Sequence, residues 1–393
     1  MVRESTTRAE GVPLRIVFTG GGTGGHVSPI VAVIEALARR GVSYEALWIG
    51  SQSGAEREAA ESLEIPYASV SVGKLRRYLS LHTVPDAGRV PLGVIQSIPI
   101  LRRFRPDAIL STGGYVGVPA VVAGRTLGIP TLTHEQTAVL GLATRIIARF
   151  SHCVALSHAR TPHPRVMKGG RVTVTGNPIR SILRVGDAAS VRSHFDLSSE
   201  LPLLYVTGGA QGALGINAAI GAALPELLEF VEIVHQTGPN RFNGSYAQLC
   251  RLRSELPPRL AARYHPVERV GDELAHLYAA ADLVLGRSGA GTVAELAALG
   301  LPAILTPLPG ATEQRENARV LEAVGAAIVV DQDDLTPVRL LRELRQLAAD
   351  PARRSTMAAA ALATVAAGDP AALLVDELLY LARRDSPAPD PAA

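Results

Sequence analysis

The sequence predicts an α/β protein built from two tandem Rossmann-like domains with a cleft between them. Two stretches of the chain share one pattern, in which an apolar strand runs into a glycine-rich loop and then into a helix, as at the start of a Rossmann-like unit. The strands are residues 14–19 and 203–207, the loops 20–25 and 208–213, and the helices 29–40 and 216–230. At 393 residues the chain is also longer than a single hydrophobic core usually supports, which favours two domains.

Further short apolar segments alternate with helical patterns in both halves of the chain. They are residues 46–49, 108–110 and 131–133 in the first half, and 232–235, 283–285 and 303–306 in the second. This alternation predicts parallel sheets with helices on both faces. The polar stretch 184–202 lacks a strand pattern, so we place the domain boundary there, with domains at 12–185 and 186–384. The tail 385–393 consists of Pro, Ala, Ser and Asp and is predicted to be disordered.

Composition excludes several classes of protein. The net charge of +3, from 39 basic and 36 acidic residues, gives no indication of a nucleic-acid partner. Cys153 and Cys250 are far apart and lie in no Cys/His pattern, which indicates neither a disulfide framework nor a zinc site and fits a reducing cytoplasm. Residues 1–11 lack the apolar core of a signal peptide, and no apolar run reaches about 18 residues. Any membrane contact is therefore expected to be peripheral.

The first glycine loop, Gly20-x-Gly22-x-x-Gly25, formally matches the dinucleotide fingerprint. Its glycines would let backbone amides approach a diphosphate at the N-terminus of a helix. The fingerprint also requires an acid at the end of the second strand, where this chain has Ile49-Gly50-Ser51-Gln52. NAD is therefore a disfavoured ligand.

His26 follows this loop and precedes Ser28 and Pro29, which we expect to be the N-cap and the first residue of a helix. The N-terminus of a helix disfavours imidazolium and would keep His26 neutral. A neutral imidazole in a cleft can accept a proton as a general base. The alternative is a loop histidine that only bonds the backbone.

Two more glycine-rich loops follow predicted strands. Residues 111–117 suit phosphate or sugar contact by backbone amides, or simply a tight turn between strand and helix. Residues 287–295 contain Thr292 and Glu295 at the spacing of a capping box, so Glu295 could cap the helix. Alternatively, its carboxylate could accept both hydroxyls of a ribose. The spacing alone leaves both interpretations open.

Asp331-Gln332-Asp333 superficially matches the Asp-x-Asp metal motif of some glycosyltransferases. We reject it because it lies just before Thr336-Pro337, which we interpret as an N-cap and first-turn pair. Acids just before a helix are usually solvated charges that favour its dipole. No metal site is predicted.

The segment 74–105 combines positive charge with apolar side chains and has a single acid, Asp86. Its basic residues are Lys74, Arg76, Arg77, Arg89, Arg102, Arg103 and Arg105, and the interleaved apolar residues are Leu75, Tyr78, Leu79, Ile95, Ile98, Ile100, Leu101 and Phe104. Such a mixture suits an anionic membrane surface. The apolar residues could equally face the core.

Taken together, these motifs resemble the MurG family of N-acetylglucosaminyltransferases, which convert lipid I to lipid II. The matching motifs cover residues 14–330 in family order. They are Thr19-Gly-Gly-Gly-Thr-Gly-Gly-His26, Gly113-Gly-Tyr-Val116, His134-Glu-Gln136, Gly176-Asn-Pro-Ile-Arg180, Gly208-Gly209 with Gln211-Gly-Ala213, Arg287-Ser-Gly-Ala290 with Thr292-Val-x-Glu295, and Gln314-x-x-Asn317-Ala318.

The resemblance implies the GT-B architecture, with the acceptor site in the N-terminal domain and UDP-N-acetylglucosamine in the C-terminal domain. It implies no metal and no cofactor. The partners are the donor, the lipid-linked muramyl-pentapeptide acceptor and the anionic cytoplasmic face of the cell membrane. The three glycine loops at 20–25, 113–117 and 208–212 would face acceptor and donor phosphates, where amides and helix dipoles stabilise the leaving UDP.

The resemblance also implies the reaction and its residues. The muramyl 4-hydroxyl would attack the anomeric carbon with inversion, after His26 takes its proton. The donor-binding residues would be Thr23, Gly24, Gly25, Arg180, Gly209, Ala210, Gln211, Ala290, Gly291, Glu295, Gln314 and Asn317, and the acceptor-binding residues Thr23, Tyr115, Glu135 and Thr137. Within the donor set, Glu295 would bind the ribose, and Arg180 and Gln211 would bind the diphosphate. The sugar hydroxyls would be bound by Gln314 and Asn317.

The chain departs from the family pattern at a few positions. Thr137 stands for the usual Asn, Ala210 for a Ser, Gly291 for a bulky apolar residue, and Val270-Gly271 for the Phe-Ile pair beside uracil. Because of these departures, a paralogue that uses another nucleotide sugar or acceptor remains the rival interpretation. A nucleotide-sugar-binding regulator without turnover is a second rival, and His26 and Glu295 argue against it.

Overall fold

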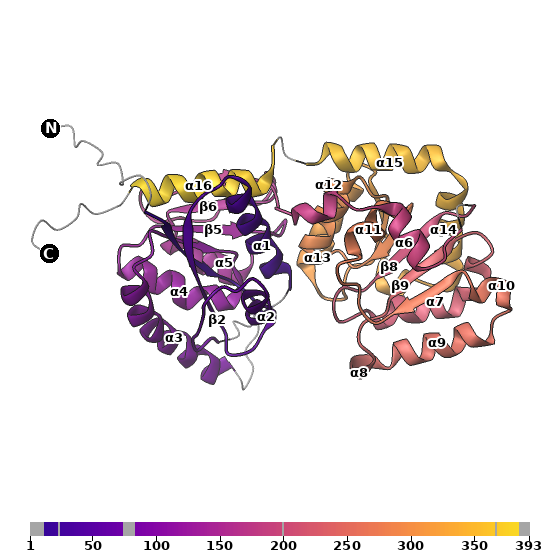
Figure 1. Ribbon diagram of the computed structural model, residues 1–393, viewed down its shortest axis with the longest axis horizontal. Coiled ribbons are helices and arrows are strands. Elements are labelled where there is room, and N and C mark those ends of the chain that lie inside the picture. Colours follow the sequence, from indigo (N-terminus) through magenta and orange to yellow (C-terminus); the bar gives the residue numbers. More distant parts are fainter. Residues whose placement is uncertain (1–11, 23, 74–82, 199, 366–367, 385–393) are drawn as a thin grey trace, which may run out of the picture. The chain divides into compact units, whose positions relative to one another are not determined.

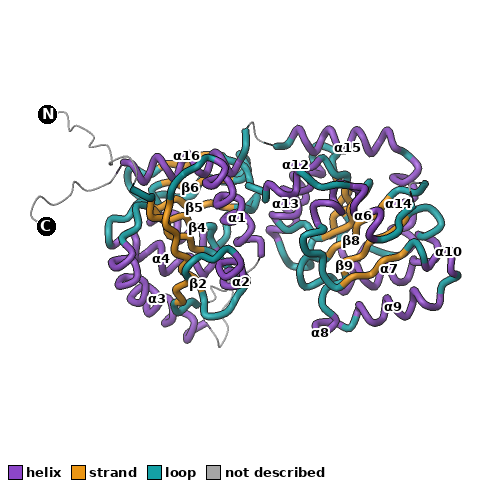
Figure 2. Tube along the Cα trace, viewed as in Figure 1, coloured by secondary structure: helices purple, strands orange, loops and turns teal. Residues whose placement is uncertain are grey.

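The computed structural model describes residues 12–22, 24–73, 83–198, 200–365 and 368–384. The chain forms two compact units, and each is treated separately below (Figure 1). The first unit comprises residues 1–178 together with 366–393, and the second comprises Ile179–Val365. In each unit a parallel sheet lies between helices, as the strand and helix colours of Figure 2 show. The two Rossmann-like sheets that the sequence predicts are therefore confirmed.

The sheet of the first unit has seven parallel strands. They are β1 (Leu14–Thr19), β2 (Tyr44–Gly50), β3 (Tyr67–Ser69), β4 (Ala108–Ser111), β5 (Thr131–Glu135), β6 (Cys153–Leu156) and β7 (Arg171–Val174). Their order is β3-β2-β1-β4-β5-β6-β7, so the direction of winding reverses between β1 and β4. Open α/β sheets bind ligands at the carboxyl ends of the strands at such a point. Thr19 pairs with Ser111 there, so the loops after β1 and β4 start side by side.

Helices cover both faces of this sheet. They are α1 (Gly24–Arg39), α2 (Ala55–Ser62), α3 (Thr83–Phe104), α4 (Gly114–Thr126), α5 (Leu142–Ile147) and α16 (Pro370–Arg384), with the short η1 (Ala148–Phe150). Side chains alternate along a strand. Ile16 and Phe18 of β1 accordingly pack in one core with α1 and α16, and Val17 packs in another with α3 and α4.

The C-terminal helix α16 belongs to the first unit, and not to the second domain in which the sequence analysis placed residues up to 384. Its apolar face, including Leu374 and Leu378, lies in the same core as α1. Ion pairs fix its outer side, from Arg39 to Asp369 at 3.0 Å and from Arg40 to Asp376 at 2.5 Å. The second unit begins at Ile179, before the boundary expected between 185 and 186. The tail 385–393 lies outside the described residues.

The sheet of the second unit repeats the arrangement with six parallel strands. They are β8 (Leu203–Thr207), β9 (Glu232–Gln236), β10 (Tyr264–Val267), β11 (Leu283–Gly286), β12 (Ala303–Leu305) and β13 (Ala327–Val329), in the order β10-β9-β8-β11-β12-β13. The winding reverses between β8 and β11, where Thr207 pairs with Gly286. The loops after these two strands thus occupy the ligand-binding position of this sheet.

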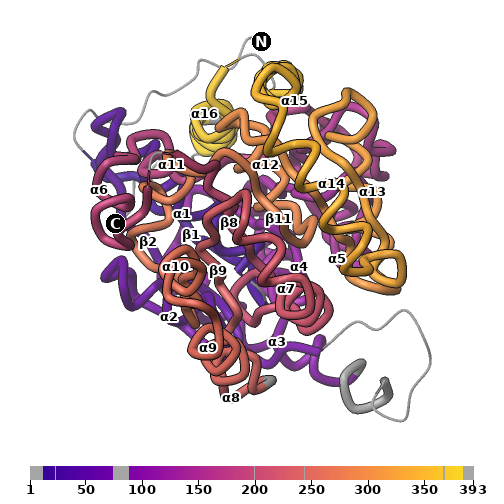
Figure 3. The backbone as a smooth tube through the Cα atoms, turned by 90° about the vertical axis from the view of Figure 1, so that its right-hand side faces the viewer, coloured from indigo at the N-terminus to yellow at the C-terminus, as the bar shows by residue number. Residues whose placement is uncertain are grey.

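The helices of the second unit again form two layers. They are α6 (Ala188–His194), α7 (Leu214–Leu227), α8 (Asn240–Asn243), α9 (Ser245–Glu255), α10 (Pro258–Ala261), α11 (Leu274–Ala280), α12 (Ala290–Leu299), α13 (Thr312–Glu322), α14 (Pro337–Ala349) and α15 (Pro351–Ala363), with the short η2 (Ser181–Arg184) and η3 (Gln332–Asp334). Leu204 and Val206 of β8 pack with α7 and α14, whereas Leu203 and Tyr205 pack with α11 and α12. Helix α9 lies beside α7 (Figure 3).

All the strands expected from the sequence are confirmed, with ends that differ by two residues or fewer. The expected helix start at Pro29 is wrong, because α1 begins at Gly24 and contains Pro29. Proline removes one intrahelical hydrogen bond, and here the lost acceptor, the Gly25 carbonyl, lies in the first turn, so the helix survives. Ser28 is consequently a helical residue and not the N-cap.

Candidate active site

In the first unit, the loops after β1 and β4 are joined by hydrogen bonds between Thr112 and two partners. The Thr112 amide donates to the Thr19 carbonyl at 2.9 Å, and the Thr112 hydroxyl donates to the His26 carbonyl at 2.6 Å. The His26 ring returns a contact, with Nδ1 2.8 Å from the Thr112 carbonyl oxygen. His26 is therefore fixed in the first turn of α1, at the switch point of the sheet.

This contact determines which ring nitrogen of His26 can act as a base. A carbonyl oxygen only accepts hydrogen bonds, so Nδ1 carries the proton of the neutral ring and Nε2 presents its lone pair. Nε2 faces Gly114, where a Cβ would lie only 3.2 Å from it. Gly114 has φ +71°, a left-handed conformation that favours glycine. The glycine loop at residues 113–117 thus leaves room for the imidazole.

Glu56 is a functional candidate that the sequence analysis missed. The side chain is fully buried, and its carboxylate accepts from the Gly22 amide at 3.0 Å and from the Ser51 hydroxyl at 2.5 Å. The Gly22 amide is therefore occupied within the protein, whereas the resemblance assigned the amides of this loop to phosphate. An acid in the first turn of a surface helix is common, so the sequence held no signal for this role.

The residues expected to bind the acceptor lie around these loops. The Tyr115 ring lies directly against the first glycine loop, since a Cβ on Gly22 would lie 2.9 Å from its Cε1. Glu135 is buried, and its two carboxylate oxygens accept from the amides of Thr137 and Gly141 at 3.1 and 3.2 Å. The Thr137 hydroxyl also donates to Glu135, at 2.7 Å. Thr23 lies outside the described residues.

The buried His134 fixes the chain next to these residues. Its Nε2 lies 3.0 Å from the Gly176 carbonyl oxygen, and burial lowers the pKa of the ring to about 4. The ring is therefore neutral at physiological pH and donates to that carbonyl. His134 is a structural histidine, in contrast to the partly exposed His26.

In the second unit, the loop after β8 presents an exposed surface at the carboxyl end of the sheet. Gly209, Ala210 and Gln211 are all exposed, and nothing lies within 4 Å of a Cβ placed on Gly209. The loop is anchored from behind, because the Gly209 carbonyl accepts from Gln236 Nε2 at 3.0 Å. The loop leads directly into α7, whose N-terminus favours an anion.

Glu295 lies on α12, after the neighbouring strand β11. Helix α12 begins at Ala290, its N-cap is Gly289, and no side chain caps it, so the capping interpretation of Glu295 is wrong. The carboxylate instead accepts from the Tyr278 hydroxyl at 2.9 Å. Burial raises the pKa of Glu295, and the Tyr278 hydrogen bond and the Arg180 charge partly offset that rise. Nothing lies within 4 Å of a Cβ placed on Gly291, so the chain leaves open space where the family has a bulky residue.

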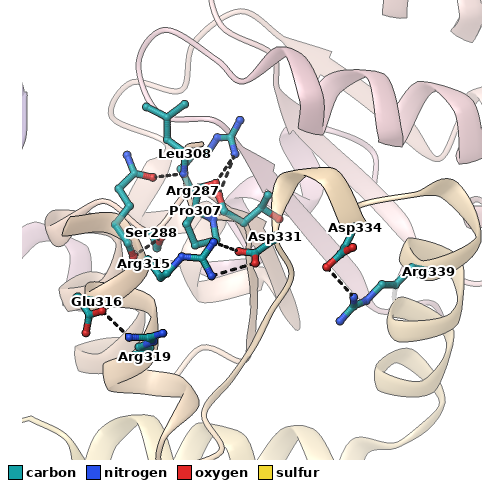
Figure 4. Close-up of polar contacts among 12 residues, drawn as sticks. Arg287, Ser288, Pro307, Leu308, Arg315, Glu316, Arg319, Asp331, Asp334 and Arg339 are labelled. Atoms are coloured by element: carbon teal, nitrogen blue, oxygen red, sulfur yellow. Dashed lines mark hydrogen bonds and ion pairs between the residues drawn. The ribbon is translucent and has the colours of Figure 1, made fainter. Parts of the chain in front are cut away.

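Gln314 and Asn317 both connect α13 to the loop after β11. Asn317 is buried and donates to the Ser288 carbonyl at 3.3 Å, which makes it a support for this loop. Gln314 is partly exposed. Its side-chain oxygen accepts from the Leu308 amide at 3.0 Å, and its backbone carbonyl accepts from the Ser288 hydroxyl at 2.8 Å. Figure 4 shows the contacts at Ser288 and Leu308 beside Arg287, which donates to two backbone carbonyls.

The Asp331-Gln332-Asp333 motif lies near this loop but is engaged differently. Asp331 forms an ion pair with Arg315 at 2.7 Å (Figure 4). Thr336 is the N-cap of α14 and accepts from the Arg339 amide at 3.2 Å, with Pro337 in the first turn, as expected from the sequence. Over the described ranges, no group of three or more His, Cys, Asp or Glu side chains is placed to bind a metal.

The basic and apolar segment corresponds in part to α3, and its residues 74–82 lie outside the described residues. Leu92 and Ile95 are 48% and 64% exposed on α3, which also exposes Arg89, Arg102 and Arg103. Among the described residues of the interleaved apolar set, four pack into the core, as the alternative interpretation expected; they are Ile98, Ile100, Leu101 and Phe104. Within the described part of the chain, no helix has the length and hydropathy needed to cross a bilayer.

Comparison with known proteins identifies relatives along most of the chain. Residues 16–156 match the Glycosyltransferase family 28 N-terminal domain, and residues 203–374 match the Glycosyltransferase family 28 C-terminal domain. A Treponema denticola protein is 37% identical over 383 residues, which cover 93% of this chain and 96% of the relative. It is named UDP-N-acetylglucosamine--N-acetylmuramyl-(pentapeptide) pyrophosphoryl-undecaprenol N-acetylglucosamine transferase. A Lachnospira eligens protein of the same name is 34% identical over 339 residues, 86% of this chain and 91% of its own. The crystal structure of Acinetobacter baumannii MurG matches with a TM-score of 0.71 and 25% identity, covering 94% of this chain and 100% of that one.

Proposed function

The chain belongs to glycosyltransferase family 28, and on that premise we propose that it transfers N-acetylglucosamine from UDP-N-acetylglucosamine to lipid I. The acceptor atom is the 4-hydroxyl of the muramyl residue, the anomeric carbon inverts, and the product is lipid II. The observation that carries the proposal is the 37% identity, over 93% of the chain, to a relative whose name gives these two substrates.

The first unit supplies the base in this proposal. His26 Nε2 takes the proton of the acceptor hydroxyl as its oxygen attacks the anomeric carbon. The Nδ1 contact with the Thr112 carbonyl, at 2.8 Å, supports this role because it fixes both the tautomer and the direction of the ring. Tyr115, beside the same loop, and the hydrogen-bonded pair Glu135 and Thr137 are the acceptor-binding residues, with Thr23 assigned by the resemblance alone.

The second unit supplies the donor site in this proposal. Glu295 accepts the ribose hydroxyls, and the exposed loop at Gly209, Ala210 and Gln211 binds the diphosphate at the N-terminus of α7. Negative charge that develops on the leaving UDP is stabilised by these amides and by Arg180, whose charge also offsets part of the rise that burial causes in the pKa of Glu295. Gln314 contacts the sugar, and Asn317 acts from behind by holding the Ser288 carbonyl.

We assign the exposed face of α3 to the cytoplasmic surface of the cell membrane, where a lipid-linked acceptor resides. Leu92 and Ile95 would enter the interfacial region, and Arg89, Arg102 and Arg103 would contact anionic headgroups. This peripheral placement brings the acceptor-binding unit to its substrate.

A paralogue that uses another donor or acceptor is the rival, since Ala210, Gly291 and Val270-Gly271 depart from the family pattern. A panel of UDP-N-acetylglucosamine, UDP-N-acetylgalactosamine and UDP-glucose, each with a short-chain lipid I analogue, separates the two. The proposal predicts that kcat/KM is highest for UDP-N-acetylglucosamine. A higher value for another donor, or transfer only to a different acceptor, supports the paralogue.

A further inference from the structure

Tyr278 and Glu295 form a contact between two helices in which one partner is buried and the other reaches the surface. The Tyr278 hydroxyl on α11 donates to Glu295 Oε2 on α12 at 2.9 Å. Tyr278 is 4% exposed, whereas Glu295 is partly exposed. The buried phenol therefore holds one carboxylate oxygen of a residue that is itself partly exposed.

The phenol itself cannot move far. Its ring packs edge-on against Tyr205 of β8, with centroids 5.7 Å apart and planes at 77°. The Tyr205 hydroxyl donates to Gln236 Oε1 at 2.9 Å, and Gln236 Nε2 donates to the Gly209 carbonyl at 3.0 Å. One chain of contacts thus connects Glu295 to the exposed glycine loop, so both are positioned by the same pair of buried rings.

The chemistry of the carboxylate explains what this contact can do. An ionised carboxylate only accepts hydrogen bonds, and one phenolic donor leaves most of its lone-pair sites free for two neighbouring hydroxyls. The terminal torsion of a glutamate is broad when nothing holds it. Ligand binding would then have to immobilise the carboxylate, which weakens affinity. A phenol hydroxyl that already holds the carboxylate removes this cost of immobilisation.

We propose that Tyr278 is a positioning residue that orients the Glu295 carboxylate toward the 2′- and 3′-hydroxyls of a ribose. Tyr278 thereby sets the preference of the site for ribonucleotides over 2′-deoxyribonucleotides. The inference rests on the donor role of Glu295 in the proposed function, and it adds a residue that does not itself touch the nucleotide.

Calorimetric titrations of UDP and 2′-deoxy-UDP test this inference. The full chain is compared as wild type, Tyr278→Phe, Glu295→Gln and the double variant, and phenylalanine preserves the ring packing against Tyr205. We expect wild type to prefer UDP by about tenfold or more, the scale of one hydrogen bond to a charged group. Tyr278→Phe should reduce that preference to about threefold or less, and Glu295→Gln should abolish it. In the Glu295→Gln background, Tyr278→Phe should leave the ratio of the two dissociation constants unchanged.

Tyr264→Phe is the matched control, since it removes a buried phenol of the same unit whose hydroxyl lies 2.9 Å from His235 Nδ1. It should keep the wild-type preference for UDP, and thermal melts establish that each variant is folded. If Tyr278→Phe keeps the full preference while Glu295→Gln loses it, the positioning role of Tyr278 is refuted and the donor role of Glu295 stands. If wild type shows no preference and Glu295→Gln binds UDP normally, the donor role fails, and the inference fails with it.

Discussion

His26 Nδ1 lies 2.8 Å from the carbonyl oxygen of Thr112, the residue that follows the neighbouring parallel strand. The same carbonyl accepts from Gln136 Nε2 at 2.5 Å. Two donors therefore converge on one oxygen, and its position is fixed by strands β4 and β5. The geometry assigns the proton of His26 to Nδ1 and the basic lone pair to Nε2.

Replacing this base should impair chemistry and spare donor binding. We expect His26→Ala to lower kcat by about 100-fold or more while the UDP dissociation constant stays near wild type, because general bases contribute on this scale. His163→Ala, which removes an exposed histidine of the same unit, is the control and should retain activity. Normal turnover by His26→Ala would remove His26 from the mechanism.

The conformation of Gly114 predicts opposite results for two glycine-to-alanine changes. At Gly114 a Cβ would lie 2.8 Å from the Gly21 carbonyl oxygen, at φ +71°, so Gly114→Ala should destabilise the protein by more than about 1 kcal/mol and lower kcat. Gly291→Ala, inside α12 with open space around it, should stabilise by about 0.5–1 kcal/mol. Thermal melts measure both changes. Equal changes in melting temperature at the two positions would contradict this account of the glycine loop at residues 113–117.

Glu295 should contribute to donor affinity and not to helix capping. We expect Glu295→Gln to raise the UDP dissociation constant about tenfold to hundredfold, the effect of losing a hydrogen bond to a charged group. Since Gly289 is the N-cap of α12, any loss of stability in Glu295→Ala should come from the buried Tyr278 hydroxyl that loses its acceptor, about 1–3 kcal/mol, and should largely vanish in the Tyr278→Phe background. Calorimetry and thermal melts on both variants measure these effects. Unchanged UDP affinity in Glu295→Gln would end the ribose role.

The pKa of Glu295 predicts how the stability of wild type, relative to Glu295→Gln, depends on pH. Burial raises the pKa of Glu295 in the folded chain. The folded state therefore binds the carboxyl proton more tightly than the unfolded state does, and the ionised form is disfavoured in the folded state. As pH rises through the range above the ordinary Glu pKa, wild type should lose stability relative to Glu295→Gln. The difference in melting temperature between the two proteins, measured from pH 4 to 7, tests this. A wild-type melting temperature that rises relative to that of Glu295→Gln as pH increases would contradict it.

The exposed face of α3 predicts binding to anionic vesicles. Arg102→Glu with Arg103→Glu should weaken binding to phosphatidylserine vesicles by about 1 kcal/mol per charge removed, and more for full reversal. Arg342→Glu with Arg345→Glu on α14 makes the same change in charge at two exposed arginines of the second unit, and should bind as wild type. Co-sedimentation at low salt measures the affinities. The membrane assignment fails if both pairs of substitutions behave alike.

Two buried histidines predict loss of stability in weak acid. Burial lowers the pKa of His134 to about 4 and of His235 to about 3, below the ordinary value of 6.5. The unfolded chain therefore binds more protons as pH falls below about 6.5, and each histidine should cost about 1.4 kcal/mol per pH unit in that range. Urea midpoints at pH 7, 6 and 5 should decrease in that order. A midpoint independent of pH would indicate that the two rings are solvated.

The sequence was sufficient for the strands and for the loops at the two switch points, because a strand, a glycine loop and a helix form a contiguous local signal. It was insufficient for α16, whose apolar face indicates burial but not which sheet covers it. Glu56 and Tyr278 were missed for the same reason, since an acid in a first turn and a tyrosine in a helix are ordinary residues. Their roles come from contacts between separate elements. The Thr292 and Glu295 spacing misled because helix α12 begins three residues earlier than a capping box there requires.

The most direct test of the proposed function is the product formed from UDP-N-acetylglucosamine and a short-chain lipid I analogue. Mass spectrometry of the wild-type reaction should show the acceptor heavier by one N-acetylhexosamine residue, and NMR should show a β-linkage at the muramyl 4-position. His26→Ala should form this product at about 1% of the wild-type rate or less. An unmodified acceptor in the presence of folded, UDP-binding protein, or an α-linked product, would contradict the account.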